Sequence, residues 1–234
     1  MRSLFYRQQN QDPRSLPCLH NGKSRGIKDH RYILSMSNYV AAMNAIIACG
    51  IFQKEIEALE SDLGFPFEAH YLEPGLHVDF DDLSNALHTE LEKARANGCE
   101  GIIVAYGQCH PKMDDILKPY HAVLMECQSC VDAFITRKVM EKKANGGLFF
   151  YLSPGWLDAW RNIFEQLGWG QIETRLHMGS FRGVVYMDTL KDASLREQEL
   201  LEFFDFTNLP FEVMPVDLNH FKSLLVKAKR SLED

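Results

Sequence analysis

Strand-like and helix-like stretches alternate along this chain from residue 43 onward. Short runs bounded by turn residues, typical of buried strands, occupy residues 44–48, 67–72, 102–105, 121–126, 148–152, 183–187 and 211–215. Apolar positions at helical spacing mark residues 51–61, 79–96, 128–142, 156–167, 194–204 and 217–230. Because strands separated by helices form parallel sheets with right-handed crossovers, the pattern predicts an α/β protein. We expect a mostly parallel, Rossmann-like sheet with helices on both faces.

Residues 1–35 lack this periodicity and differ in composition. They hold seven Lys or Arg residues against two Asp. Such a segment is typical of a disordered basic tail, and Met36 and Met43 are alternative starts downstream of it. We therefore expect one α/β domain over residues 36–234, with Cys18 outside it.

Composition and charge limit the classes of function. Hydrophobic residues make up 46% and charged residues 24% of the chain, an ordinary balance for a soluble globular protein. The formal net charge of -7 argues against nucleic acid as a partner, because phosphate binding requires a basic surface. No apolar run approaches the roughly 20 residues that span a membrane, so no membrane association is expected. Six cysteines without a secretory segment predict a cytoplasmic protein whose thiols are free, metal-bound or catalytic.

Three of the predicted strands are each followed by a cysteine, namely Cys49, Cys109 and Cys127. In an open α/β sheet, ligands bind beyond the carboxyl ends of the strands, so these thiols meet if their strands are neighbours. Cys130 forms a CxxC pair with Cys127. If residues 128–142 form a helix, its dipole lowers the pKa of the Cys127 thiol at its start.

Thiolates at this edge predict a site for a soft metal. Cysteine sulfur selects zinc or an iron–sulfur cluster, and histidine nitrogen often completes such a site. The candidate metal ligands are Cys49, Cys109, Cys127, Cys130, His77 and His110. Residues at or near other predicted strand ends are expected to line the same pocket: Tyr106, Gly107, Glu126, Tyr151, Trp156 and Asp188. Cys99 precedes its strand and belongs at the opposite end of the sheet.

Two other functions fit the same residues. Free cysteines are often small buried hydrophobic residues, so the protein is alternatively a metal-free small-molecule binding protein. It is also a candidate thiol-redox enzyme that uses Cys127 with Cys109 or Cys130. The sequence contains neither GxGxxG nor GxxxxGK(S/T), the two glycine-rich motifs that bind nucleotide phosphates.

Six short motifs give the chain a family resemblance. They are ACG at residues 48–50, LEPGLH at 72–77, YGQC at 106–109, EC at 126–127, YLSPGW at 151–156 and YMDT at 186–189. In order and spacing they resemble the domain of unknown function 1638, a family of uncharacterised bacterial and archaeal proteins, over about residues 43–226. The resemblance implies a soluble α/β protein. Some members are associated with corrinoid-dependent methyl transfer, which implies corrinoid or methyltransferase proteins as partners.

The chain departs from the family pattern at the predicted site. The family usually continues with glycine after the cysteine of its YGQC motif, whereas His110 stands here. Before the next cysteine the family usually reads His-Asp, whereas this chain has Met125 and Glu126, and Cys130 is additional. A zinc thiolate centre activates a thiol for alkyl transfer, because coordination deprotonates it, so alkyl transfer to a thiol is the reaction we expect of a metal-bound form. A link to corrinoid methyl transfer is implied by the family resemblance alone.

Overall fold

The structure, a computed structural model, describes residues 43–144 and 146–233. The predicted tail at residues 1–35, including Cys18, lies outside these residues. None of the helices in the described ranges is long and apolar enough to cross a membrane.

Within the described part of the chain, four parallel strands form a first sheet in the order β2-β1-β3-β4. Their bounds are β1 (Asn44–Cys49), β2 (Phe67–Leu72), β3 (Gly101–Ala105) and β4 (Ala122–Leu124). Asn44 is in register with both Phe67 and Gly101, so the strands start together at one edge. Their carboxyl ends therefore share the other edge, where a parallel sheet places ligand sites.

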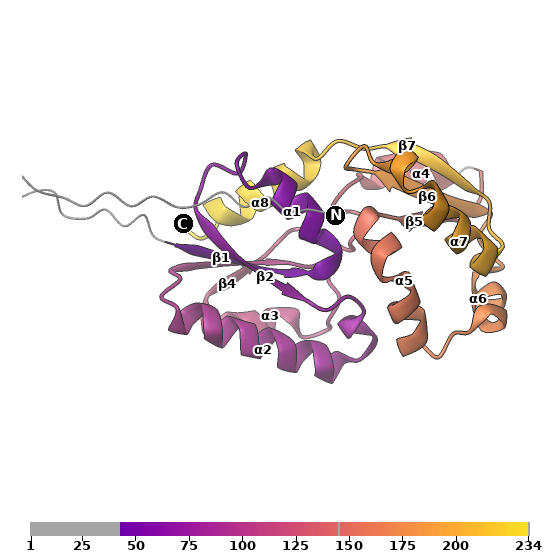
Figure 1. Ribbon diagram of the computed structural model, residues 1–234. Helices are drawn as coiled ribbons and strands as arrows, with labels where there is room; N and C mark the ends of the chain where they lie inside the picture. Colours follow the sequence, from indigo (N-terminus) through magenta and orange to yellow (C-terminus); the bar gives the residue numbers. More distant parts are fainter. Residues whose placement is uncertain (1–42, 145, 234) are drawn as a thin grey trace, which may run out of the picture. The chain divides into compact units, whose positions relative to one another are not determined.

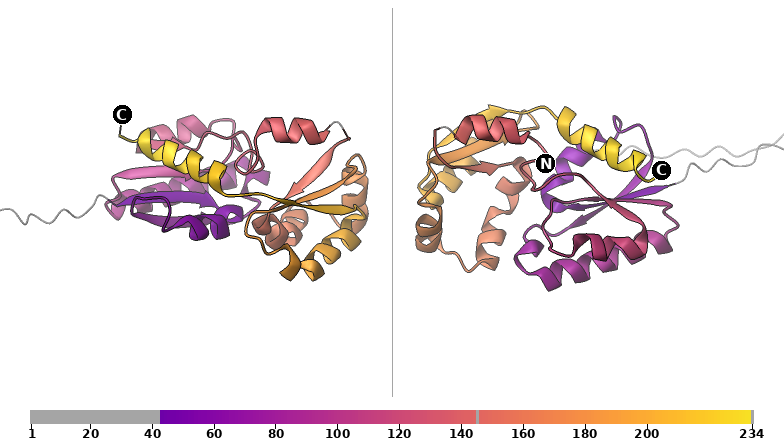
Figure 2. Two further views of the ribbon diagram at one scale, coloured as in Figure 1. Left: turned by 90° about the horizontal axis from the view of Figure 1, so that it is seen from above. Right: turned by 180° about the vertical axis from the view of Figure 1, so that it is seen from behind.

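Helices cover both faces of the first sheet. Four pack there: α1 (Gln53–Leu59), α2 (Phe80–Ala96), α3 (Met113–Leu117) and α8 (Asn219–Arg230). Helices α1 and α8 lie on one face, and α2 and α3 on the other (Figure 1, Figure 2). Every residue of β1 and β3 is buried, as expected of parallel strands enclosed on both sides.

The C-terminal helix contributes to the core of the first sheet. Phe221 of α8 is fully buried, with ring centroids 5.2 Å from Phe52 and 5.3 Å from Phe134. Phe52 follows β1 in the 3₁₀ turn η1 (Gly50–Phe52), so this aromatic cluster lies near the carboxyl edge of the sheet.

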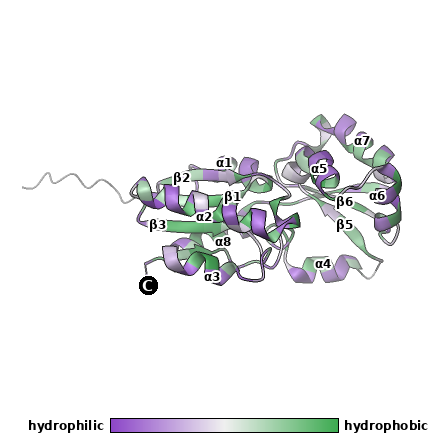
Figure 3. Cartoon of the chain, turned by 90° about the horizontal axis from the view of Figure 1, so that it is seen from below, coloured by the Kyte–Doolittle hydropathy of each residue, from purple (hydrophilic) through white to green (hydrophobic). Residues whose placement is uncertain are grey.

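A second parallel sheet has the order β5-β6-β7, with β5 (Phe149–Leu152), β6 (Gly183–Asp188) and β7 (Phe211–Pro215). Its helices are α4 (Arg137–Ala144), α5 (Pro154–Gln166), α6 (Gln171–Met178) and α7 (Glu197–Thr207). Helix α4 lies on the opposite side of this sheet from α5 and α7 (Figure 2, Figure 3). Aromatic contacts fill the core between α5 and α7, where Trp160 and Phe203 meet edge to face at 5.3 Å.

The predicted α/β class with parallel strands and helices on both faces is confirmed. The strands are divided between two sheets, which the strand–helix alternation does not reveal.

Asp79 is the N-cap of α2, because its carboxylate accepts hydrogen bonds from the backbone N–H groups of Asp81 and Asp82.

The predicted helix at residues 128–142 is wrong in its first half, because α4 begins only at Arg137. The hydroxyl of Ser129 donates to Asp132 Oδ2 at 2.9 Å and accepts from the Asp132 backbone N–H at 3.3 Å. Such local side-chain bonds compete with the hydrogen bonds of a helix. Cys127 and Cys130 consequently lie in an irregular loop after β4.

Candidate cysteine site

Four cysteines stand beyond the carboxyl ends of the first sheet. Cys49 is the last residue of β1, Cys109 lies in the loop after β3, and Cys127 and Cys130 lie in the loop after β4. None of the cysteines in the described ranges forms a disulfide. The order β1-β3-β4 makes these three strands neighbours, so their loops emerge side by side.

The four thiols lie close enough for charge on one to affect another. Burial is the main cause of the raised pKa of Cys49 and of Cys127, and negative charge on Cys109 or Cys130 would raise both further. Charge on Cys109 also raises the pKa of Cys130. We call Cys49, Cys109, Cys127 and Cys130 the cysteine cluster. Cys99 is not part of it, because its charged neighbours are Glu68 and Arg95.

Gly107 lets two of these loops touch. A Cβ atom on this glycine would lie 2.8 Å from Ser129 Cα and 2.9 Å from the Gln128 carbonyl oxygen. The Gln108 backbone N–H also donates to that carbonyl at 3.1 Å. The loops carrying Cys109 and Cys130 are therefore held in direct backbone contact.

Burial keeps the cluster thiols protonated. It raises the pKa of Cys49 and Cys127 to about 12 and that of Cys130 to about 11, and it also raises the pKa of Cys109. The Cys127 thiol donates to the Tyr106 carbonyl oxygen at 3.4 Å. The expectation that a helix dipole lowers the pKa of Cys127 is therefore wrong, because Cys127 lies in a loop and desolvation dominates.

Two aromatic side chains border the cluster. The indole N–H of Trp156, in the first turn of α5, donates to Cys130 Sγ at 3.4 Å and lowers the pKa of that thiol. Tyr106 is 1% exposed, and its hydroxyl lies near the Cys49 thiol. Within the described residues this hydroxyl has no hydrogen-bond partner of normal geometry.

The thiols are neighbours without being arranged as metal ligands. In residues 43–144 and 146–233, no three His, Cys, Asp or Glu side chains are placed to hold one metal ion. His77 lies half-buried in the 3₁₀ turn η2 (Leu76–Val78), where burial lowers its pKa. His110 packs edge to face against Phe80, at 5.3 Å between ring centroids.

A family model matches more than half of the chain. The family model described as "Protein of unknown function (DUF1638)" matches residues 71–225. The chain belongs to this family. The predicted resemblance is thus confirmed, and the matched range includes Cys109, Cys127 and Cys130, whereas Cys49 precedes it. A comparison with curated proteins gave no match.

Several solved structures are similar to this chain at low sequence identity. A transcription regulator like protein from Staphylococcus haemolyticus has 9% identity and a TM-score of 0.43, over 82% of this chain and 91% of that chain. Transcription regulator CcpA of Lactococcus lactis has 11% identity and a TM-score of 0.37, over 82% and 90%. A LacI family transcriptional regulator from Lactobacillus casei has 13% identity and a TM-score of 0.39, over 81% and 90%. These scores carry no argument about the function of this DUF1638 protein.

Three predicted pocket residues have other partners. Glu126 is exposed and pairs with Lys227 of α8 at 2.5 Å. Asp188 ends β6 in the second sheet, where its carboxylate accepts from the backbone N–H groups of Asp192 and Ala193. Tyr151 lies within β5, half-buried in a cavity along α4. The structure thus groups Tyr106, Gly107 and Trp156 with the cysteines. Glu126 lines a cavity together with Cys127, whereas Tyr151 and Asp188 belong to strands of the second sheet.

A cavity of about 480 Å³ opens beside Cys127. Its lining includes Asp132, Arg137 and His220, none of which sequence reasoning selected. His220 reaches it from α8, with Nε2 3.1 Å from the Asp132 carbonyl oxygen. A contact across 88 residues leaves no local signal in the sequence.

Proposed function

We propose that this protein binds zinc or an iron–sulfur cluster through the thiolates of Cys49, Cys109 and Cys127. Cys130 is a fourth ligand or a reserve thiol. The observation that supports this is that all four cysteines end or follow neighbouring parallel strands at the carboxyl edge of the first sheet. Soft thiolates are the ligands that both zinc and iron–sulfur clusters select.

Protonation of the free thiols fits a metal site better than a redox site. A thiol-redox enzyme needs a thiolate near neutral pH, and burial opposes it at Cys49, Cys127 and Cys130. A bound metal supplies the missing stabilisation, since coordination deprotonates a thiol outright. Each thiol proton then passes to solvent as its sulfur–metal bond forms.

Metal binding requires the sulfur atoms to converge. Zinc–sulfur bonds of about 2.3 Å in a tetrahedron bring thiolates to about 4 Å from one another. Three of the four cysteines lie in loops, where rotation of side chains and small backbone shifts bring sulfurs together. The cavity beside Cys127 is the side from which a metal or a substrate enters.

Three protein thiolates leave one coordination position open. An open position is the mark of a catalytic zinc site and of a cluster with one free iron. If Cys130 stays outside the metal, that position accepts a substrate thiol. Methyl transfer involving corrinoid proteins stays a prediction from the family resemblance.

Metal content of protein purified without oxygen tests the proposal. We expect about one zinc ion or one cluster per chain, measured by elemental analysis and ultraviolet–visible spectra after reconstitution. Cys49→Ser, Cys109→Ser and Cys127→Ser should each lose the metal, because a hydroxyl is a poor substitute for a soft thiolate. Cys99→Ser is the matched control, a buried cysteine outside the cluster that should leave metal content unchanged.

Two outcomes would contradict the proposal. One is reconstituted wild-type protein with no more metal than Cys109→Ser. The other is a metal-free protein in which mild oxidant removes two titratable thiols and a Cys127–Cys130 disulfide forms, which would favour the thiol-redox function. Mass spectrometry of the oxidised peptides distinguishes them.

A further inference from the structure

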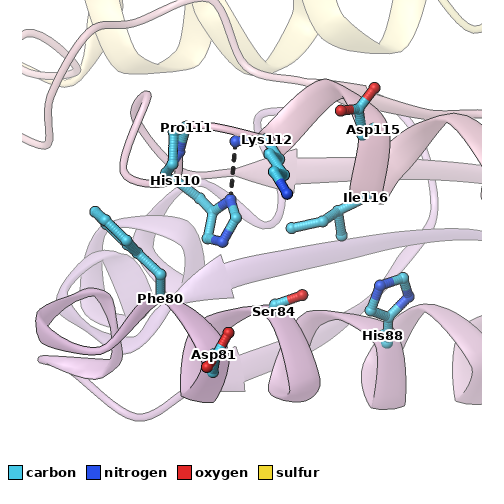
Figure 4. A pocket seen from close by; sticks show the side chains of 9 residues that line it. All are labelled: Phe80, Asp81, Ser84, His88, His110, Pro111, Lys112, Asp115 and Ile116. Atoms are coloured by element: carbon cyan, nitrogen blue, oxygen red, sulfur yellow. Dashed lines mark hydrogen bonds between the residues drawn. The ribbon is translucent and has the colours of Figure 1, made fainter.

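A second cavity, of about 440 Å³, lies on the α2 and α3 side of the first sheet. Side chains of α2 form its floor, and residues 110–116, which follow the cluster residue Cys109, form its roof (Figure 4). No cysteine lines it. Its volume lies within the range of roughly 300–1,000 Å³ that is usual for small-molecule sites.

His110 presents a buried donor to this cavity. His110 is only 8% exposed, and its Nδ1 accepts a hydrogen bond of 3.0 Å from the Lys112 backbone N–H. An accepting Nδ1 places the ring proton on Nε2, so that nitrogen is a donor. Among the described residues Nε2 of His110 has no hydrogen-bond partner, and the ring points into the cavity (Figure 4).

Two further donors point into the same space. The ammonium group of Lys112 extends beside the His110 ring, and Ser84 carries its hydroxyl on α2, across the cavity from both (Figure 4). Lys112 forms no ion pair within residues 43–144 and 146–233. An N–H donor, an ammonium and a hydroxyl, none of which bonds to a protein acceptor among the described residues, suit an anionic group of a ligand.

The other end of the cavity offers acceptors. His88 Nδ1 lies 3.1 Å from the Tyr120 hydroxyl, which donates its proton to Glu92 at 3.4 Å. His88 Nδ1 is therefore the donor in its contact, which leaves Nε2 of the neutral ring as an acceptor. Asp81 also carries an acceptor, but it lies below His110 at the first end of the cavity, whereas Asp115 points away from the cavity (Figure 4).

We propose that this cavity binds a small organic carboxylate that also carries a hydroxyl or amino group. The carboxylate is held by His110 Nε2, Lys112 Nζ and Ser84 Oγ. An amino group next to that carboxylate faces Asp81, and a hydroxyl further along the ligand faces His88. Phe80, 52% exposed, and Ile116 contribute apolar walls for the carbon skeleton. This inference does not depend on metal at the cysteine cluster.

Calorimetric titration with amino acids and hydroxycarboxylates tests it on the full chain. At least one of these acids should bind, and its primary amide should bind roughly tenfold more weakly or not at all, because the amide lacks the charge that Lys112 pairs with. Binding by none of the acids, or equal binding of acid and amide, would overturn the proposal. Binding only by phosphate esters would also overturn the assignment to carboxylates.

Variants with matched controls locate the site. Lys112→Met and His110→Asn should each weaken binding roughly tenfold or more, since both remove a donor to the anion. In His110→Asn the amide oxygen would still accept from the Lys112 backbone N–H, so the loop is preserved while the Nε2 donor is lost. Lys118→Met, an exposed lysine outside the cavity, should bind as wild type does. Unchanged affinity in both cavity variants would refute the site, and unchanged thermal unfolding shows that they fold.

Discussion

The hydroxyl of Thr189 donates a hydrogen bond of 2.7 Å to Oε1 of Glu55, joining the turn after β6 to helix α1 across 134 residues of sequence. Glu55 is fully buried, and its second oxygen, Oε2, has no partner among the described residues. Burial raises the pKa of this carboxyl to about 7. The contact therefore links the two sheets through a carboxyl group that is protonated below neutral pH.

We predict that this carboxyl makes the protein less stable as the pH rises from about 5 to about 7. In this window the unfolded chain, with an ordinary pKa of 4.5, has lost the Glu55 proton, whereas the folded chain still holds it. Raising the pH therefore favours unfolding, by about 3 kcal/mol in total, and the loss levels off above pH 7. Urea unfolding at a series of pH values measures the effect.

Glu55→Gln isolates this carboxyl from others in the chain. The amide is neutral at every pH, so the decline between pH 5 and pH 7 should be largely absent from this variant. Glu57→Gln, at an exposed position in the same helix, should keep the wild-type decline. Parallel pH profiles of Glu55→Gln and wild type would contradict the assignment.

Thr189→Val removes the hydroxyl while keeping the side-chain shape. Glu55 Oε1 then loses its donor inside the protein, which should cost about 1–3 kcal/mol of unfolding free energy. The cost should be larger at pH 8 than at pH 5, because the hydroxyl stabilises the charged carboxylate and lowers its pKa. An equal cost at both values, measured by urea unfolding, would show that the bond does not depend on ionisation.

Gly155 of α5 packs directly against the backbone of the turn after β1. A Cβ atom there would lie 2.1 Å from the Ile51 carbonyl oxygen and 2.6 Å from Ile51 Cα. Gly155→Ala should therefore destabilise the protein by about 3 kcal/mol or more, since backbone must move. It should also displace Trp156 from Cys130, which tryptophan fluorescence reports.

Gly170→Ala is the control for this substitution. The added atom would meet only the carboxylate of Glu173, which is on a flexible side chain that can move aside. We expect a change in unfolding free energy of less than about 1 kcal/mol. Equal destabilisation by the two substitutions would mean that the Gly155 contact is not specific.

The strand pattern alone led to the cysteine site. Placing Cys49, Cys109 and Cys127 after strands was sufficient, because neighbouring parallel strands bring their carboxyl ends to one edge. Asp188 shows the limit of this reasoning, since it also ends a strand but in the second sheet. Periodicity reports which segments are strands and carries no information about which strands pair.

Other features depend on contacts that the sequence pattern does not encode. The loop at residues 126–136 has helical periodicity, yet the Ser129–Asp132 hydrogen bonds and the backbone contact at Gly107 hold it open. His110 Nε2 is a donor because His110 Nδ1 accepts a hydrogen bond from the Lys112 backbone N–H, a contact that the sequence pattern does not specify. The Glu55–Thr189 hydrogen bond is likewise not encoded in the sequence pattern, since it joins residues far apart in the chain.

Proton release is the last prediction, and it follows from the raised pKa values of the cluster. At pH 7 the thiols of Cys49, Cys127 and Cys130 are protonated, because burial raises their pKa to about 12, 12 and 11. Zinc binding should therefore release roughly one proton for each cysteine ligand, three or four in all. Each proton released makes zinc binding tenfold tighter per pH unit. Between pH 6 and pH 8 the affinity for zinc should therefore rise by three or four powers of ten for each pH unit.

Titration of the metal-free protein with zinc in a weak buffer containing a pH indicator measures this release directly. Cys109→Ser should release fewer protons and bind more weakly, whereas Cys99→Ser should match the wild type. A release of less than one proton per zinc would mean that the metal binds to histidine and carboxylate groups elsewhere. Such a result would remove the thiol cluster as the metal site, because buried protonated thiols cannot coordinate zinc without losing their protons.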